Sequence, residues 1–395
     1  MHNKKTSAVL VALFLLPWGM QCLVSNILPI YVASLPFASE STVGLVTGIG
    51  ALITMLSQFV WASIADRSKR KSRVLCTSLL IVTAASALFL AVPVTNIVIL
   101  LVLTVLFYSS YMTHQPLIDT IGAEQYSQTK HPFSWFRSFA SLGYGCMELL
   151  YILLLLLNDN NGLIFLYIAI LALASAVISL FVQDAKPAAS ETIKTAEKFT
   201  ITASFVKFLV FTFFLFVCGS TITTFFPVYF TAEDGLRGDT KLFTLIAGVG
   251  TFLEWGIMLV LSKPISKLKS NTAFLLIALA GALRSAVLFL APSPYVAALI
   301  APFNALWFGL LWSVSTPYLK QLVPENALAR AQGIWTVVAF GIAPFVGSYL
   351  GGIVAEYVGM RTLFLLAALL MLAMVVTSGW FFQAKSRKLV NKYCL

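Results

Sequence analysis

The stretch FVWASIADRSKRKSRVL, residues 59–75, changes from apolar to strongly basic and back to apolar. The same pattern returns in LVLSKPISKLKSNTAFL, residues 259–275, in the second half of the chain. A short basic turn between two long apolar runs is typical of a cytoplasmic loop between two transmembrane helices, because short loops rich in Lys and Arg stay in the cytoplasm. The two stretches therefore predict a membrane protein whose second half repeats the first.

The composition of the whole chain agrees with this prediction. Of the 395 residues, 59% are hydrophobic and 10% are charged, whereas soluble domains carry roughly 25% charged residues. A helix that crosses a bilayer needs about 20 mostly apolar residues. Runs of this kind occupy residues 8–35, 42–65, 74–93, 96–122, 133–157, 162–183, 201–230, 241–263, 272–291, 294–322, 329–355 and 361–383. We therefore expect an all-α membrane protein with 12 transmembrane helices.

The distribution of basic residues predicts the orientation of these helices. If both termini are cytoplasmic, the cytoplasmic segments hold 21 of the 26 Lys and Arg residues, and the outer loops hold only Arg237, Lys241 and Arg361. The net charge of +11 then reflects topology, and no nucleic-acid partner is needed to explain it. We expect a multi-pass protein of the cell membrane, plasma or inner, with both termini in the cytoplasm.

The chain also has a natural division. The long polar stretch DAKPAASETIKTAEKFT, residues 184–200, falls between the sixth and seventh apolar runs. It predicts an N-terminal six-helix bundle at 1–183, a cytoplasmic linker at 184–200, and a C-terminal six-helix bundle with a short cytoplasmic tail at 201–395. Parallel repeats of six spans are the organisation of a large transporter fold.

Besides the basic residues counted with the loops, five charged residues lie inside the predicted spans and are distributed over four helices. They are Asp119, Arg137, Glu148, Glu254 and Arg284. Charges at bilayer depth are costly, and they usually face a bundle interior or a water-filled cavity. Buried ion pairs that lock two helices together are the alternative. The clustering of the five residues favours a functional site.

The fifth span, which contains FASLGYGCMELL at residues 139–150, carries a polar stripe. At about 100° per residue, Ser141, Tyr144 and Glu148 point within roughly 40° of Arg137. The fourth span, taken as one continuous helix, has a stripe with the same spacing. Its members are Tyr108, Met112, Gln115 and Asp119. Because lipid leaves polar groups unsatisfied, the two stripes predict the wall of an amphiphilic cavity.

Other spans contribute polar and aromatic side chains that are candidates for contact with a solute. They are Trp18, Gln21 and Asn26 on the first span, Gln58 on the second, Asn304 on the tenth and Gln332 on the eleventh. Mixtures of this kind suit sugars and nucleosides, whose hydroxyls need hydrogen bonds and whose apolar faces stack on rings. Packing and interfacial belts are the more common role of aromatic residues in spans.

The chain resembles the major facilitator superfamily over essentially its whole length. ADRSKRKSR, residues 65–73, is similar to the loop between the second and third helices of that superfamily, although the expected glycine is missing. The resemblance implies that Asp66, Arg67 and Arg70 pair with a neighbouring helix end and stabilise one conformation. Positive-inside anchoring alone would also account for the basic residues.

A narrower resemblance covers QPLIDTIGAEQYSQTKHPFSWFRSFASLGYG, residues 115–145. It is similar to the fourth and fifth helices of lactose permease and related sugar and nucleoside proton symporters. That group has a carboxylate, an arginine 18 positions later and an aromatic residue seven beyond, which here are Asp119, Arg137 and Tyr144. Further matches are Gln58, Glu254 in GTFLEWG and Arg284 in AGALRSA. The resemblance implies solute binding at Arg137 and Asp119.

The tenth span departs from that group. Lactose permease has a histidine and a glutamate there that handle the proton, whereas APFNALWFG, residues 301–309, has Asn304 and Trp307. If transport is coupled to protons, a carboxylate elsewhere must change its protonation. Glu254, with Arg284 on the next helix, is the first choice, and Glu148 is the second. A static Glu254–Arg284 bridge with facilitated diffusion is the alternative.

The sequence has no GxxxxGK[ST] loop, no Cys/His cluster and no nucleophile elbow, so we expect no ATP hydrolysis, no metal, no cofactor and no enzymatic activity. The leading hypothesis is a secondary active transporter that acts as a monomer. It would carry a sugar, oligosaccharide or nucleoside with protons by alternating access. A proton-coupled exporter of drug-like or lipophilic compounds is the alternative. A non-transporting receptor or membrane enzyme is a third class.

Overall fold

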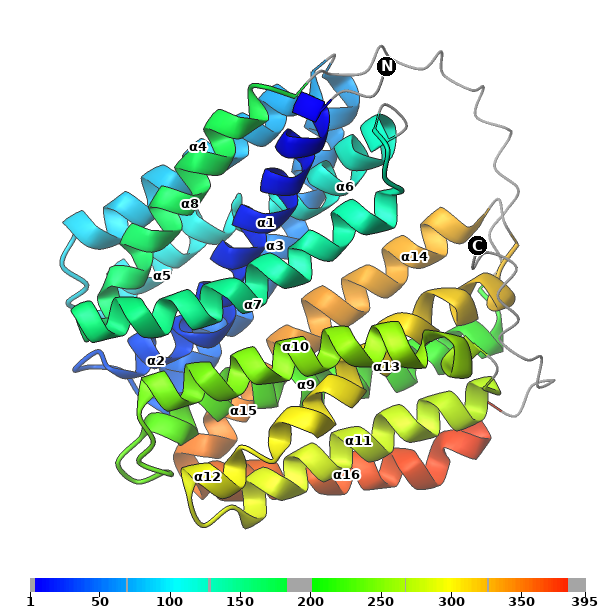
Figure 1. Ribbon diagram of the computed structural model, residues 1–395. Coiled ribbons are helices and arrows are strands. Elements are labelled where there is room, and N and C mark those ends of the chain that lie inside the picture. The colour runs from blue at the N-terminus through cyan, green and yellow to red at the C-terminus, as the bar shows by residue number, and fades with distance from the viewer. Residues whose placement is uncertain are drawn as a thin grey trace. The chain divides into compact units, whose positions relative to one another are not determined.

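The helices of the chain follow one another with short connections (Figure 1). The computed structural model describes residues 4–68, 70–126, 129–182, 201–266, 268–324 and 327–382, and within these ranges it contains no β-strand. The all-α prediction is confirmed. The predicted linker at 184–200 lies outside the described residues.

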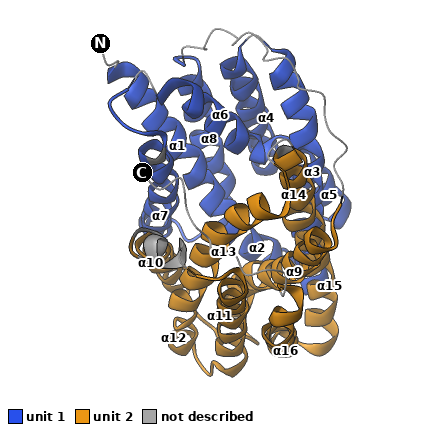
Figure 2. Ribbon diagram, turned by 90° about the vertical axis from the view of Figure 1, so that its right-hand side faces the viewer, with its two compact units in different colours: residues 1–192 blue, residues 193–395 orange. Residues whose placement is uncertain are grey.

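The chain divides into two compact units, Met1–Thr192 and Ile193–Leu395 (Figure 2). The first unit contains α1 (Lys4–Asn26), α2 (Leu28–Ala33), α3 (Glu40–Arg67), α4 (Lys71–Ala91), α5 (Ile97–Tyr108), the 3-10 turn η1 (Tyr111–Thr113), α6 (His114–Gln125), α7 (Phe133–Leu157), the 3-10 turn η3 (Asn161–Leu163) and α8 (Ile164–Ser179). The second contains α9 (Ala203–Thr231), α10 (Thr240–Ser266), α11 (Ser270–Leu290), α12 (Pro294–Ala297), α13 (Ile300–Leu322), α14 (Leu328–Val337), the π-helical turn η5 (Val338–Ile342), α15 (Ala343–Val358) and α16 (Met360–Phe381).

Each of the twelve predicted runs is occupied by a helix or by a helix with a break, as expected for 12 transmembrane helices. Eleven described segments are long and apolar enough to cross a membrane. The eighth run is filled by α10, whose 27 residues exceed the roughly 20 needed to span a bilayer. Gly359, with a φ of 93°, joins α15 to α16 in a conformation that glycine adopts without steric cost.

The predicted span over 96–122 is found as one candidate span, Ile97–Gln125, but it is not one regular helix. α5 ends at Tyr108, and the turn η1 separates it from α6. The hydroxyls of Ser109 and Thr113 donate to the carbonyls of Leu106 and Ser110 at 2.7 and 2.6 Å. Tyr108 is therefore on a different helix from Gln115 and Asp119, and the predicted stripe does not form one helix face.

The two units repeat one pattern of helix packing. In the first unit, α1 packs against α7 and α8, α3 packs against α5, and α4 packs against α8. In the second unit, α9 packs against α15 and α16, α10 packs against α13, and α11 packs against α16. Since each of these helices has the same place in the order of spans, the two halves of the chain have the same architecture.

A glycine allows the closest helix contact in each unit. A Cβ on Gly143 of α7 would overlap the backbone carbonyl of Leu15 on α1. A Cβ on Gly347 of α15 would overlap the carbonyl of Val217 on α9. Small residues permit this backbone approach between membrane helices. The first and fifth spans of each repeat are thus held together in the same way.

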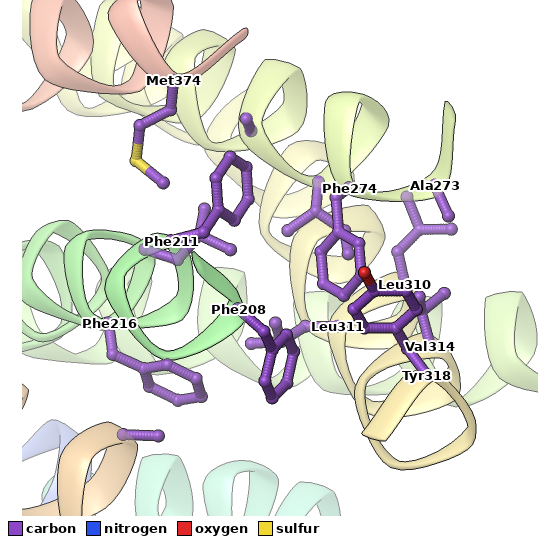
Figure 3. Packing of buried hydrophobic residues seen from close by; sticks show 14 of the residues in the cluster. Phe208, Phe211, Phe216, Ala273, Phe274, Leu310, Leu311, Val314, Tyr318 and Met374 are labelled. Atoms are coloured by element: carbon purple, nitrogen blue, oxygen red, sulfur yellow. The ribbon is translucent and has the colours of Figure 1, made fainter. Parts of the chain in front are cut away.

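An aromatic core fixes the second unit (Figure 3). Phe208 of α9 packs against Tyr318 of α13, with 5.5 Å between ring centroids, and Phe274 of α11 lies 5.2 Å from the same ring. Met374 of α16 is part of the same buried cluster. This core joins α9, α11, α13 and α16. Trp307 is also part of it.

Candidate functional site

Arg137 and Asp119 form an ion pair between α7 and α6 in the first unit. Arg137 Nε lies 3.2 Å from Asp119 Oδ1, and the two side chains are 36% and 35% exposed. Asp119 Oδ1 accepts no hydrogen bond, so the contact is ionic and lacks hydrogen-bond geometry. The guanidinium also lies over the ring of Trp18 on α1, with 4.8 Å between Cζ and the ring centroid. Three residues predicted from separate spans are therefore brought together.

His114, the first residue of α6, lies beside this group. It is fully buried, and its ring meets the Trp18 ring edge-on at 5.4 Å. Its Nδ1 lies 2.7 Å from the carbonyl oxygen of Tyr111, whereas its Nε2 has no hydrogen-bond partner. With the proton on Nδ1, Nε2 is a buried acceptor. His114 was not among the predicted site residues, because its place depends on the helix break before it.

The predicted stripe on α7 has the expected orientation. Arg137, Ser141 and Tyr144 are half-buried and Glu148 is 1% exposed, whereas Leu142 on the other side is 40% exposed. The carboxylate of Glu148 accepts a hydrogen bond of 2.8 Å from the amide Nδ2 of Asn26. Glu148 is thus joined to α1, as Arg137 is.

The remaining candidates of the first unit are distributed around these contacts. Gln21 has a buried Oε1 without a hydrogen-bond partner, and its backbone carbonyl accepts a bond of 3.5 Å from Tyr111 Oη. Gln58 and Gln115 are half-buried. Tyr108 is 9% exposed and packs edge-on against Tyr111, so its ring is part of the core.

Arg284 on α11 is the centre of a second group, in the second unit. It is fully buried, its Nη1 donates to Asn304 Oδ1 at 2.8 Å, and its Nη2 donates to the carbonyl of Gly219 at 3.3 Å. The ring of Trp307 lies 4.1 Å from the Cζ atom of Arg284. The two residues that replace the expected histidine and glutamate therefore both contact the arginine.

Glu254 does not reach Arg284 in this structure. It is half-buried on α10, and among the described residues no basic nitrogen lies within 4.0 Å of its carboxylate. An ideal Cβ on Gly250 of α10 would lie 3.8 Å from the Cβ of Ala301 on α13. Because α10 and α13 run in the same direction (Figure 1), Glu254 is at the level of Ala305, next to Asn304.

The predicted residues of the basic loop and of the eleventh span make fewer contacts with the candidate site. Asp66, Arg67 and Arg70 are exposed, and Gln332 is exposed on α14. Next to the basic loop, an ion pair joins Lys71 of α4 to Glu124 of α6. Glu124 was missed because a lone glutamate near a helix end has no distinctive spacing. No group of three or more His, Cys, Asp or Glu side chains in the described ranges could hold a metal.

The family model of the MFS_1 like family matches residues 11–366. The chain belongs to this family. It is 21% identical over 397 residues to YwbF of Bacillus subtilis (strain 168), described as an uncharacterized transporter, with 98% of this chain and 97% of that protein covered.

Two solved structures are similar over nearly the whole chain. A variant of the nucleoside transporter NupG superposes with a TM-score of 0.81 at 16% identity, covering 96% of this chain and 100% of that chain. The POT family transporter PepTSo superposes with a TM-score of 0.76 at 12% identity, covering 98% and 100%. The protein is therefore a multi-pass membrane transporter of the major facilitator type, and it is not an enzyme.

Proposed function

We propose that this transporter carries a small polar solute, a nucleoside or a sugar, together with protons across the cell membrane by alternating access. In this proposal the protein works as a monomer with both termini in the cytoplasm. The observation that carries the proposal is the half-exposed ion pair of Arg137 and Asp119 beside Trp18.

The chemistry of this pair suits hydroxyl-bearing solutes. Both side chains are about one-third exposed, although Asp119 Oδ1, which lies against Arg137, is itself buried. The carboxylate can therefore accept from a solute hydroxyl while the guanidinium donates to another oxygen. A purely structural ion pair would have its donors and acceptors satisfied by the protein. The name of NupG, a nucleoside transporter with the same fold, supports the choice of solute.

The proton is assigned to Glu254. Its carboxylate lies within a membrane-spanning helix without an ion pair to a described basic residue, and an unpaired charge is costly there. Taking up a proton removes that cost, so Glu254 is a suitable carrier. Glu148, hydrogen-bonded to the neutral amide of Asn26, is the second candidate.

Uptake into proteoliposomes tests the proposal. Labelled nucleosides and sugars are offered one at a time with an imposed proton gradient, and one of them should accumulate in wild-type vesicles and leave when a protonophore is added. Arg137→Lys should remove most solute binding because lysine lacks the planar fork of donors. Arg237→Lys in an exposed loop is the matched control. Failure of every nucleoside and sugar to accumulate, or extrusion of lipophilic compounds in the same vesicles, would overturn the proposal in favour of an exporter.

A further inference from the structure

Arg284 carries a buried charge that nothing described in the second unit neutralises. The side chain is fully buried, and its hydrogen-bond acceptors, Asn304 Oδ1 and the carbonyl of Gly219, are both neutral. No carboxylate in the described ranges lies within 4.0 Å of its nitrogens. An isolated buried charge is costly unless it is paired, so the arrangement is incomplete without a negative group.

Two hydrogen-bond donors of this group are also unused. Arg284 Nε and Trp307 Nε1 are buried and have no hydrogen-bond partner, and the two residues are 0% and 1% exposed. The guanidinium and the indole are in contact, with 4.1 Å between Cζ and the ring centroid. Both unsatisfied atoms can only donate, so the missing group must be an acceptor.

The position of Trp307 is fixed by its neighbours. An ideal Cβ on Gly219 would lie 2.7 Å from the outer edge of the Trp307 ring, and Phe216 packs edge-on against the same ring at 6.1 Å. The indole N–H therefore cannot swing away to find another acceptor without repacking the core. Its missing partner must come to it.

Two neighbours of the group on α13 are less buried than Arg284 and Trp307. Asn304 and Phe308, one helical turn apart, are half-buried, and the Phe308 ring lies 5.9 Å from the Cζ atom of Arg284. An ion that bound the guanidinium would have to pass these two side chains. A larger group would have to displace Phe308.

We propose that Arg284 and Trp307 bind a monovalent anion, either a free halide or the carboxylate of an organic acid. The guanidinium supplies the charge and Nε, and the indole supplies a second donor. Asn304 and the Gly219 carbonyl hold the other guanidinium nitrogens, which orients Nε. This site belongs to the second unit alone, and it does not depend on the solute or the proton coupling proposed above.

Thermal unfolding of the purified protein tests this site without any transport measurement. Sodium isethionate, whose sulfonate is bulky, is replaced stepwise by sodium chloride, sodium bromide or sodium acetate at constant sodium. A ligand that binds only the folded state raises the midpoint of unfolding in a saturable way. We expect such a rise in the wild type. A rise with chloride and bromide identifies a halide, and a rise with acetate alone identifies a carboxylate.

The decisive variant is Trp307→Phe, which keeps an aromatic face for the guanidinium and removes the indole N–H together with the second ring. It should weaken the anion affinity at least about tenfold, since a hydrogen bond to a charged group is lost. Arg284→Gln should abolish the response. Lys207→Gln is the matched control, because it removes another cation stacked on a tryptophan of the same unit, Trp380, at 4.0 Å. The absence of a saturable rise in the wild type, or the same rise in Trp307→Phe, would overturn the proposal.

Discussion

Arg137 and Arg284 lie on candidate membrane-spanning helices of the two units, and each lies against a tryptophan. Arg137 is partly exposed and has a carboxylate at 3.2 Å. Arg284 is fully buried and is bonded to a neutral amide and a backbone carbonyl. The two arginines lie on helices that do not correspond in the repeat, α7 and α11. A carboxylate neutralises Arg137, whereas no carboxylate in the described ranges lies within 4.0 Å of the Arg284 nitrogens.

The two units also differ in the kind of buried polar atom that has no hydrogen-bond partner. In the described part of the first unit they are acceptors, namely Gln21 Oε1, Asp119 Oδ1 and His114 Nε2 when its proton is on Nδ1. In the described part of the second unit, three of them are donors, namely Arg284 Nε and the indole nitrogens of Trp307 and Trp335. The other two are the hydroxyl of Ser315 and an acceptor, Asn271 Oδ1, at the start of α11. The repeat therefore conserves helix packing, whereas single side chains give each unit its own chemistry. One unit offers acceptors and the other mainly donors.

The largest effect is expected where the two units are alike. Gly143→Ala and Gly347→Ala each place a Cβ on a backbone carbonyl of the facing helix, so each should destabilise the protein by about 1–3 kcal/mol or more. Thermal unfolding in detergent measures this loss. Gly379→Ala on α16 is the control, because a Cβ there meets nothing within 4 Å. Equal midpoints for all three variants would show that the close contacts do not stabilise the repeat.

The second largest effect is expected at Glu254, and it should change transport but not folding. Glu254→Gln cannot release or take up a proton, so it should abolish accumulation driven by a proton gradient and preserve exchange of solute across the membrane. In proteoliposomes, gradient-driven uptake measures accumulation and counterflow measures exchange. If the variant still concentrates solute, Glu254 does not carry the proton, and Glu148→Gln becomes the decisive variant.

Asp119→Asn makes the first unit resemble the second. The substitution keeps the shape of the side chain and leaves Arg137 beside a neutral amide, as Arg284 is beside Asn304. The solute should lose one charge-assisted hydrogen bond, which weakens its binding about 10- to 100-fold. Titration of purified protein with the transported solute measures this change. Unchanged affinity would remove Asp119 from the solute site.

Asn304→Asp makes the second unit resemble the first. It places a carboxylate where Asn304 Oδ1 now lies 2.8 Å from Arg284 Nη1. The new pair should raise the midpoint of thermal unfolding and remove its dependence on chloride or acetate, because the protein then supplies the anion itself. Persistence of the anion response in this variant would contradict the charge argument for Arg284.

The smallest effect is expected at the Lys71–Glu124 pair. Its side chains are 29% and 34% exposed, and surface ion pairs contribute about 0–1 kcal/mol. Lys71→Gln should therefore leave the free energy of unfolding nearly unchanged. The one expected change is a weaker dependence of unfolding on salt concentration. A large loss of stability would mean that this loop holds the first unit together.

The sequence by itself determined the number of membrane helices and the similarity of the two halves. Bilayer thickness sets the length of an apolar run, so a run such as 133–157 could be identified with α7, Phe133–Leu157, without any tertiary contact. Helical periodicity likewise placed Arg137 and Glu148 on one stripe, because that relation lies within a single helix. The resemblance to sugar and nucleoside symporters also indicated Arg137 and Asp119, which the structure brings into contact.

Only the tertiary structure decided which side chains meet across helices. The turn η1 interrupts the fourth span before His114, and helical periodicity alone does not reveal this interruption. The environment of Arg284 depends on the rotation of α11 and α13 about their axes and on a glycine, Gly219, that admits the Trp307 ring. Spacing along the chain contains no information on these rotations. The sequence therefore suggested Glu254 as the neighbour of Arg284, whereas packing placed Asn304 and Trp307 there.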